Sequence, residues 1–350
     1  MAELVKSISE IFSNRSFRIP DYQRGYAWRK DKQLSDLWQD LELLPNNRDH
    51  FTGTLVLKPV PPPENEWIDR RGEDHHIFDV IDGQQRLTTI IILLKAIHCE
   101  MGLIGEDEDL LKGVKENYLY CEDANRLTIT LLTPNRDSRD FFRSQVLMDQ
   151  YDPRGEVNRA VKNMEEAKTF FLEKLATKRE ALGDAYPLWL GQLRLKVTRQ
   201  LKMIVYEVAD ELDAGIIFET MNDRGKPITH LDKVKNYFLY ICSKLEAPNP
   251  ARQALSEKIN ATWTRIFEEL MAARLSDDEN EDQLLRVHWL MAYDYNPNNW
   301  QQSRSIKEKF SLVAYAGDHD KLRDDLDEYL DTLQKTVTAY CDLIRPESPQ

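Results

Sequence analysis

The spacing of hydrophobic residues changes several times along the chain, and these changes predict both strands and helices. Short apolar or alternating runs are typical of strands, and they occur at 51–59, 76–81, 127–133 and 201–208. Apolar residues that recur every three or four positions predict helices at 1–13, 31–44, 84–101, 156–180 and 210–222. Strands and helices are therefore interleaved through this part of the chain.

After about residue 250 the pattern becomes purely helical. Thr229, with Asp232 three positions later, resembles a capping box that begins a helix. Further helices are expected at 250–275, 280–296 and 304–345.

These patterns predict an α+β fold class. We expect an α+β domain over residues 1–150, followed by a mostly α-helical domain over 151–350. The strand at 201–208 and the loop at 220–228 are expected to return to the first domain and pack onto it.

The composition is that of an ordinary globular protein, with 41% hydrophobic and 31% charged residues among 350. The formal net charge is −13. A protein that binds nucleic acid over most of its surface is normally basic. Any contact with DNA is therefore expected to come from a local basic patch, from a partner or from a segment missing from this sequence.

The cysteines and the N-terminus indicate a cellular compartment. The four cysteines are scattered and form no CxxC pair, which argues against a zinc site or a disulfide framework and favours a reducing environment. The N-terminus lacks the features of a signal peptide, and no apolar run reaches the roughly 18 residues of a membrane span. We therefore expect a cytoplasmic protein with no membrane partner.

The stretch FDVIDGQQRLTT, which begins at Phe78, contains the strongest candidate site. It places polar residues at the junction between a buried strand and a helix, where the first helical N–H groups and the helix dipole attract anions. Glycine allows close approach of a ligand, and arginine suits phosphate. The candidate residues are Asp82, Gly83, Gln84, Gln85 and Arg86. In the alternative interpretation, Asp82 caps the helix and Arg86 pairs with a surface carboxylate.

The stretch RSFRIPDYQRGYAWRK, at 15–30, has five basic residues and one acid. Aromatic residues lie between the basic ones, so that rings could stack on bases while arginines contact phosphates. In the alternative interpretation, Tyr22, Tyr26 and Trp28 pack in the core and the arginines are solvated. For Trp28, packing is the favoured interpretation. Candidates for DNA contact are Arg18, Arg29 and Lys30.

A third polar stretch, FETMNDRGKPIT, spans the end of the expected helix at 210–222 and the loop after it. Asn222, Arg224 and Gly225 either cap that helix or form a loop that closes over a ligand, and the residues alone favour the cap slightly. Elsewhere, His75 and His76 are adjacent, but no histidine or carboxylate lies at a spacing that would make a strong metal site.

Four blocks taken together resemble the DGQQR-motif family: IPDYQRGYAW, FTGTLVL, FDVIDGQQRLTT and FETMNDRGKPIT. The resemblance extends from about residue 7 to residue 240. It implies a ParB/sulfiredoxin-like fold for the N-terminal domain. This family forms the N-terminal half of GmrSD-type, modification-dependent (type IV) restriction enzymes and occurs in related phage-defence proteins.

The resemblance also implies hydrolysis of a nucleoside triphosphate, such as GTP or UTP, with Mg²⁺. Asp82 would hold the metal or position the attacking water, and Arg86 would neutralise phosphates together with Arg24. Gln84 and Gln85 would orient the γ-phosphate or the water. The remaining nucleotide-binding residues would be Tyr22, Gln23, Gly83, Asn222, Arg224 and Gly225.

Fuller family members continue into an HNH nuclease domain, and residues 250–350 show no such arrangement. We therefore expect the nuclease to lie in a further domain or a separate subunit, and this chain alone not to cut DNA. A homodimer is expected from the resemblance. Two functions remain open: an NTP-hydrolysing sensor in a restriction system, or a non-catalytic module that binds nucleotide or modified DNA and regulates a nuclease.

Overall fold

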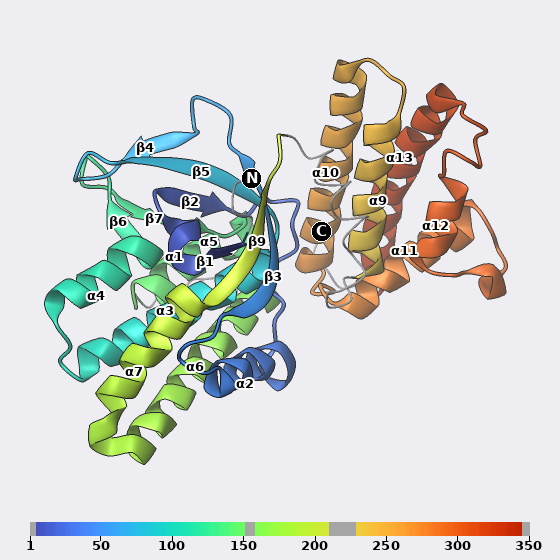
Figure 1. Cartoon of the computed structure of the whole chain (residues 1–350). Helices are drawn as coiled ribbons and strands as arrows, with labels where there is room; N and C mark the ends of the chain where they lie inside the picture. The colour runs from blue at the N-terminus through green and yellow to red at the C-terminus, as the bar shows by residue number, and fades with distance from the viewer. Residues whose placement is uncertain (1–4, 151–157, 210–228, 345–350) are drawn as a thin grey trace. The chain divides into compact units, whose positions relative to one another are not determined.

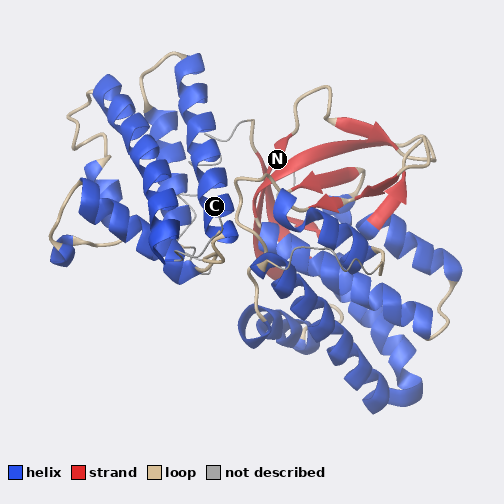
Figure 2. Cartoon of the chain, turned by 180° about the vertical axis from the view of Figure 1, so that it is seen from behind, coloured by secondary structure: helices blue, strands red, loops and turns tan. Residues whose placement is uncertain are grey.

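The structure is a computed structural model that describes residues 5–150, 158–209 and 229–344. The chain divides into two compact units, Met1–Val208 and Ala209–Gln350. Most of the larger helices of the first unit gather on one side of its sheet (Figures 1 and 2). In the second unit, every regular element among the described residues is a helix. Together the two units confirm the expected α+β class with a helical C-terminal region; the likeness to ParB and sulfiredoxin stays a prediction.

The first unit is built on a mixed sheet of seven strands. Parallel pairs join β2 to β5, β2 to β8 and β3 to β9, whereas β3–β5, β1–β9 and β4–β5 are antiparallel. The strand order is β1 (Val5–Ser7), β9 (Leu201–Glu207), β3 (His50–Pro59), β5 (Asp74–Asp82), β2 (Arg15–Arg18) and β8 (Leu132–Thr133), with β4 (Glu66–Ile68) paired to β5. A separate hairpin joins β6 (Tyr120–Glu122) to β7 (Thr128–Thr130).

The strands predicted from apolar runs are present. One predicted strand and one predicted helix differ in form from the prediction. The expected strand at 127–133 is split into β7 and β8, which belong to different sheets. The expected helix at 1–13 is instead a short strand, β1, followed by α1 (Ile8–Phe12). Ser7 explains where α1 begins, because its hydroxyl accepts a hydrogen bond from the Glu10 N–H in a capping box.

Helix α3 (Gln84–Leu103) lies at the centre of the first unit's core. Its residues from Leu87 to Ile97 are all buried, which a helix tolerates only when other elements cover all its sides. The other helices of this unit are α2 (Ser35–Leu43), α4 (Glu108–Val114), α5 (Arg136–Phe141), α6 (Arg159–Leu182) and α7 (Tyr186–Leu195). Short π-helical segments adjoin them at Lys30–Leu34, Lys115–Leu119, Phe142–Leu147 and Lys196–Gln200.

The division between the units differs from the boundary expected near residue 150. Helix α6 packs along α3, and its Phe171 and Leu175 are fully buried in the first unit's core. Strand β9 lies within the sheet between β1 and β3. Both elements therefore belong to the first unit, and the division falls after Val208.

The second unit contains α9 (His230–Lys244), α10 (Asn249–Ala272), α11 (Asp278–Ala292), α12 (Ser303–Lys309) and α13 (His319–Ile344). Its core is aromatic: Phe238, Phe310 and Tyr329 meet edge to face with ring centroids 5.1–5.7 Å apart. Thr229 caps α9, as expected, by accepting the Asp232 N–H at 3.2 Å. Among the described residues, no helix is long and apolar enough to cross a membrane.

We predict that Gly83→Ala lowers the free energy of unfolding by about 1–3 kcal/mol. Gly83 has φ +90°, and a Cβ there would lie 2.9 Å from the Thr54 carbonyl oxygen. Gly102→Ala is the matched control, because Gly102 lies in the same helix with open space around it; it should be neutral or stabilising by up to about 1 kcal/mol. Urea unfolding of the two variants measures the difference, and equal stabilities would contradict the prediction.

We also predict that the second unit loses stability in mild acid. His288 is 1% exposed, and burial lowers its pKa from the ordinary 6.5 to about 4. The unfolded chain therefore binds a proton first as the pH falls. The stability due to neutral His288 is complete above pH 6.5 and declines towards pH 4 by about 1.4 kcal/mol per unit. Urea unfolding over this range should show a shallower decline for His288→Gln than for wild type and for the exposed control His76→Gln.

Candidate functional site

The junction between β5 and α3 brings the DGQQR residues together at one point. Strand β5 ends at Asp82, Gly83 is the N-cap, and α3 begins at Gln84. Gly83 has a left-handed conformation, and the backbone of β3 passes close to it, since a Cβ would meet the Thr54 carbonyl oxygen at 2.9 Å and the Leu55 Cα at 3.4 Å. The first N–H groups of α3 lack helical partners by geometry, so they make this turn attractive to an anion.

Arg86 is the positive charge of this junction. Its Nη1 donates to the Thr54 carbonyl oxygen at 3.1 Å. Its guanidinium also fills the space that a side chain at Gly53 would occupy, because a Cβ there would lie 2.7 Å from the Arg86 Cζ. Gly53 has φ +116°, and the β3–β9 register shifts between Phe51 and Thr54, as at a bulge.

Arg86 remains positively charged although its side chain is half-buried. Burial lowers the pKa of Arg86, and the negative charge of Asp82 acts in the opposite direction. Arginine remains protonated in proteins even when its pKa falls, because the starting value is so high. The junction therefore combines a fixed cation with the positive end of a helix.

Three glutamines tie the YQR block to the DGQQR block. The Gln23 amide nitrogen donates to the Ile81 carbonyl oxygen at 2.9 Å, and Gln84 donates to the Gln23 oxygen at 3.2 Å. Gln85 accepts from the Ala27 N–H at 2.7 Å and donates to the Gly25 oxygen at 3.0 Å. Both ends of the Gln85 amide are therefore occupied by backbone, so this side chain holds the loop in place. Tyr22 and Arg24 flank Gln23 and are half-buried.

Buried polar residues that the sequence did not reveal hold this loop from behind. Asn135, 3% exposed, donates to the Gln23 carbonyl oxygen at 3.0 Å. Asn163 donates to the Tyr26 carbonyl oxygen at 3.0 Å. Tyr26 is itself buried and shares a 2.7 Å hydrogen bond with Thr89, so it anchors the core and is not available for stacking on a base.

The basic cluster expected at 15–30 is partly neutralised by acids from elsewhere. Arg18 pairs with Asp79, its register partner on β5, through hydrogen bonds of 2.7 and 3.2 Å. Arg29 pairs with Asp31 at 3.2 Å, and Arg15 with Glu207 at 2.7 Å. Lys30 is exposed. The local positive charge is thus weaker than the sequence alone indicated.

The remaining expectations concern the third block and the metal. Asn222, Arg224 and Gly225 lie outside the described residues, as do the expected helix at 210–222 and the loop at 220–228. Mg²⁺ in nucleotide sites is usually held by one or two carboxylates together with phosphate oxygens. Asp82 offers one carboxylate beside Arg86, which fits an ion that arrives with its nucleotide.

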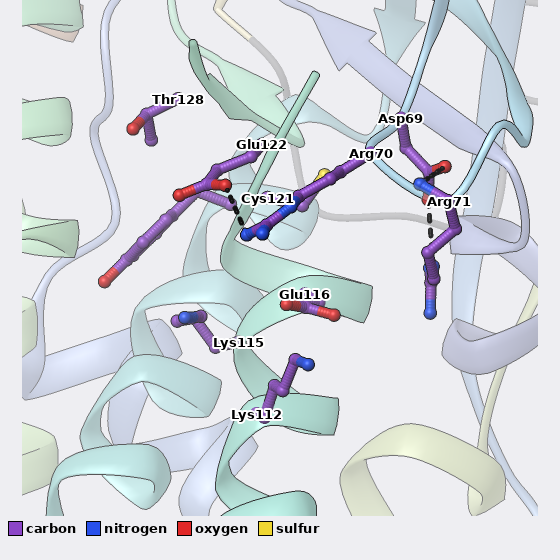
Figure 3. Close-up of a pocket in the computed structure, with 10 residues that line it drawn as sticks. Asp69, Arg70, Arg71, Lys112, Lys115, Glu116, Cys121, Glu122 and Thr128 are labelled. Atoms are coloured by element: carbon purple, nitrogen blue, oxygen red, sulfur yellow. Dashed lines mark hydrogen bonds and ion pairs between the residues drawn. The ribbon is translucent and has the colours of Figure 1, made fainter. Parts of the chain in front are cut away.

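A second hollow, of about 430 Å³, lies away from the junction (Figure 3). Its walls come from the turn after β4, from α4 with the π-helical segment that follows it, and from the β6–β7 hairpin. Its lining contains both cations and acids and comprises Asp69, Arg70, Arg71, Lys112, Lys115, Glu116, Tyr120, Cys121, Glu122 and Thr128. Arg70 and Glu122 pair across it at 3.1 Å.

The family model described as the GmrSD restriction endonuclease N-terminal domain matches residues 8–239. This match covers well over half of the chain, so the protein belongs to that family. Membership points to a part of a restriction or phage-defence system that acts on DNA and whose nuclease domain is separate. No curated protein matches the chain.

We predict that Gln85→Ala destabilises the first unit by about 1–3 kcal/mol, because the half-buried Ala27 N–H and Gly25 carbonyl lose their partners. Gln33→Ala is the matched control. Its oxygen accepts the Arg29 N–H at 2.9 Å in an exposed position, where water can replace it, and the change should stay within about 0.5 kcal/mol. Denaturant unfolding compares the two variants, and a Gln85→Ala protein as stable as the control would refute a holding role.

Proposed function

We propose that the β5–α3 junction binds and hydrolyses a nucleoside triphosphate, as the sensor of a modification-dependent restriction system. The observation that supports this most strongly is the place of Arg86. Its charge is fixed in the space beside Gly53, next to the first turn of α3. A fixed cation at the positive end of a helix stabilises phosphate charge without reorganisation during the reaction.

In this proposal each part of the junction has one task. The backbone N–H groups of α3, Arg86 and Arg24 neutralise phosphates. Asp82 holds Mg²⁺ or orients the attacking water, and bound Mg²⁺ would add Lewis-acid stabilisation of the phosphoryl oxygens. Tyr22 and Gln23 form a wall, and Asn222, Arg224 and Gly225 complete the pocket.

The glutamines take different roles from those first expected. Gln85 is a positioning residue, because its amide is hydrogen-bonded to the backbone at both ends. Gln84 donates to Gln23, and no described residue donates to its own oxygen, which can accept from water. Water activation therefore falls mainly to Asp82.

The hydrogen bonds of the three glutamines also favour a second candidate function, a binding module without hydrolysis. Gln23 and Gln85 are held by hydrogen bonds to backbone, and the Gln84 amide nitrogen is held by Gln23, so few side-chain groups remain to activate water. Such a module would use nucleotide or modified DNA as a signal and regulate a separate HNH nuclease.

We place either function in the cytoplasm, where nucleotides and invading DNA are both present, and propose that the chain works as a homodimer. Contact with DNA would use Lys30, with Arg18 and Arg29 released from their carboxylate partners. The Arg29–Asp31 pair is exposed, and pairs of this kind are individually weak. Release of Arg18 costs more, because it would leave the buried Asp79 without this partner.

We predict phosphate release from at least one of the four ribonucleoside triphosphates with Mg²⁺, and a fall of about 100-fold in Arg86→Ala. Gly53→Ala should also reduce the rate, because the added Cβ displaces the guanidinium while its charge is kept. Arg48→Ala, an exposed arginine elsewhere in the first unit, is the control. Release is measured with and without DNA, and circular dichroism checks that each variant folds.

Two outcomes separate the candidate functions. If wild type releases no phosphate but binds nucleotide with an affinity that Arg86→Ala weakens, the binding module is correct. If neither release nor binding depends on Arg86, the junction is not the nucleotide site.

A further inference from the structure

The turn between β4 and β5 gathers three residues whose side chains can bind a metal ion. One ligand atom from each of Asp69, Glu73 and His75 lies within 4.8 Å of the others. Asp69 is 3% exposed and His75 is 6% exposed, whereas Glu73 faces solvent. Residue spacing alone does not reveal this group, because it depends on a turn that folds Asp69 back onto a residue six positions later.

His75 has an unusual environment for a buried histidine. Neither of its ring nitrogens has a hydrogen-bond partner among the described residues. Its Nε2 lies 3.7 Å from the Asp69 Oδ2, which is too far for a hydrogen bond. The ring stacks on Trp67 with centroids 4.1 Å apart, so its direction is fixed. A buried polar group left without a partner costs about 1–3 kcal/mol, and a bound ion would remove that cost.

The carboxylates of Asp69 and Glu73 differ in the contacts that position them. The Asp69 Oδ1 accepts the N–H groups of Arg71 and Glu73 at 2.8 and 2.9 Å, which fixes the side chain in the turn. The Asp69 Oδ2 faces His75 and accepts from the Arg71 Nε at 3.1 Å. Arg71 also approaches Glu73 at 3.7 Å.

Arg71 occupies the position of a cation between the carboxylates. Its side chain is 55% exposed and in Figure 3 extends away from Asp69 on the lower side of the turn. A long exposed arginine can leave such a pair at little cost. A metal ion could therefore replace it without any change in the backbone.

We propose that Asp69, Glu73 and His75 bind a divalent transition-metal ion of the zinc type. One imidazole nitrogen and two carboxylate oxygens are ordinary zinc ligands, and three protein ligands leave a fourth position for water or another ligand. Mg²⁺ and Ca²⁺ prefer oxygen ligands throughout, so the imidazole selects against them.

The site would also stiffen a wall of the second hollow. Asp69 lines that hollow, and the turn is joined to the β6–β7 hairpin by hydrogen bonds from the Arg70 N–H to the Glu122 oxygen and from the Ala124 N–H to the Ile68 oxygen. An ion held by Asp69 and His75 would connect this turn firmly to β5. The metal is therefore expected to stabilise the first unit as well as to bind.

The test is a calorimetric titration of the metal-free full chain with Zn²⁺ alone. Wild type should bind one equivalent, and Glu73→Gln and His75→Gln should bind at least about 100-fold more weakly. His76→Gln is the matched control, because His76 follows on the same strand with a side chain 57% exposed, and it should bind like wild type. Glu73 is exposed, so its variant should fold even if His75→Gln does not.

Two further measurements distinguish the proposed site from binding elsewhere. Arg71→Gln should bind Zn²⁺ more tightly than wild type, because a competing cation is removed. Co²⁺ should give visible absorption bands of a low-coordinate site that disappear in Glu73→Gln. The proposal is overturned if wild type binds no stoichiometric Zn²⁺, or if the affinity is unchanged in both Glu73→Gln and His75→Gln.

Discussion

The close passage of β3 over the β5–α3 junction is the constraint on which the rest of the first unit depends. It requires two glycines with positive φ, Gly53 and Gly83, because a Cβ at either position would meet atoms closer than 3 Å. Arg86 then occupies the space beside Gly53 and binds the Thr54 carbonyl oxygen. The central helix, the strand over it and the positive charge are thereby fixed by one set of contacts, so the site and the core cannot be altered independently.

The glutamine contacts extend that constraint to the loop between β2 and α2. Amide side chains can both donate and accept, which lets Gln85 satisfy an N–H and a carbonyl of the same loop. Asn135 and Asn163 also hold this loop, because they donate hydrogen bonds to the carbonyl oxygens of Gln23 and Tyr26. A loop held by five neutral hydrogen-bonding side chains keeps its shape at any pH near neutrality, which suits a pocket that must exist before its ligand arrives.

The sequence predicted the elements better than their grouping. The runs that form β3, β5, β9 and α3 were correctly placed, because each is a distinct apolar run whose length is typical of a strand or of a helix. The domain division differed, since the apolar period of α6 is the same whichever core receives it. The junction was located because polar residues rarely separate two buried elements without cause. Asn135 could not be found, because a buried asparagine looks like a surface one in a single sequence, and the approach of Asp69 to His75 depends on a turn.

The geometry of β5 separates the two proposed sites. The metal ligand His75 stands near the start of this strand and Asp82 at its end. Seven residues of extended chain span about 23 Å at roughly 3.3 Å per residue, which is longer than a nucleoside triphosphate can bridge with its phosphates. The ion at the β4–β5 turn therefore cannot be the Mg²⁺ of a hydrolytic step at α3. If the sites communicate, the most direct route is β5 itself, which runs from the proposed metal ligand His75 to Asp82 beside Arg86. Because Arg18 on β2 pairs with Asp79 midway along β5, the same strand also carries the contact that must open for this arginine to reach DNA.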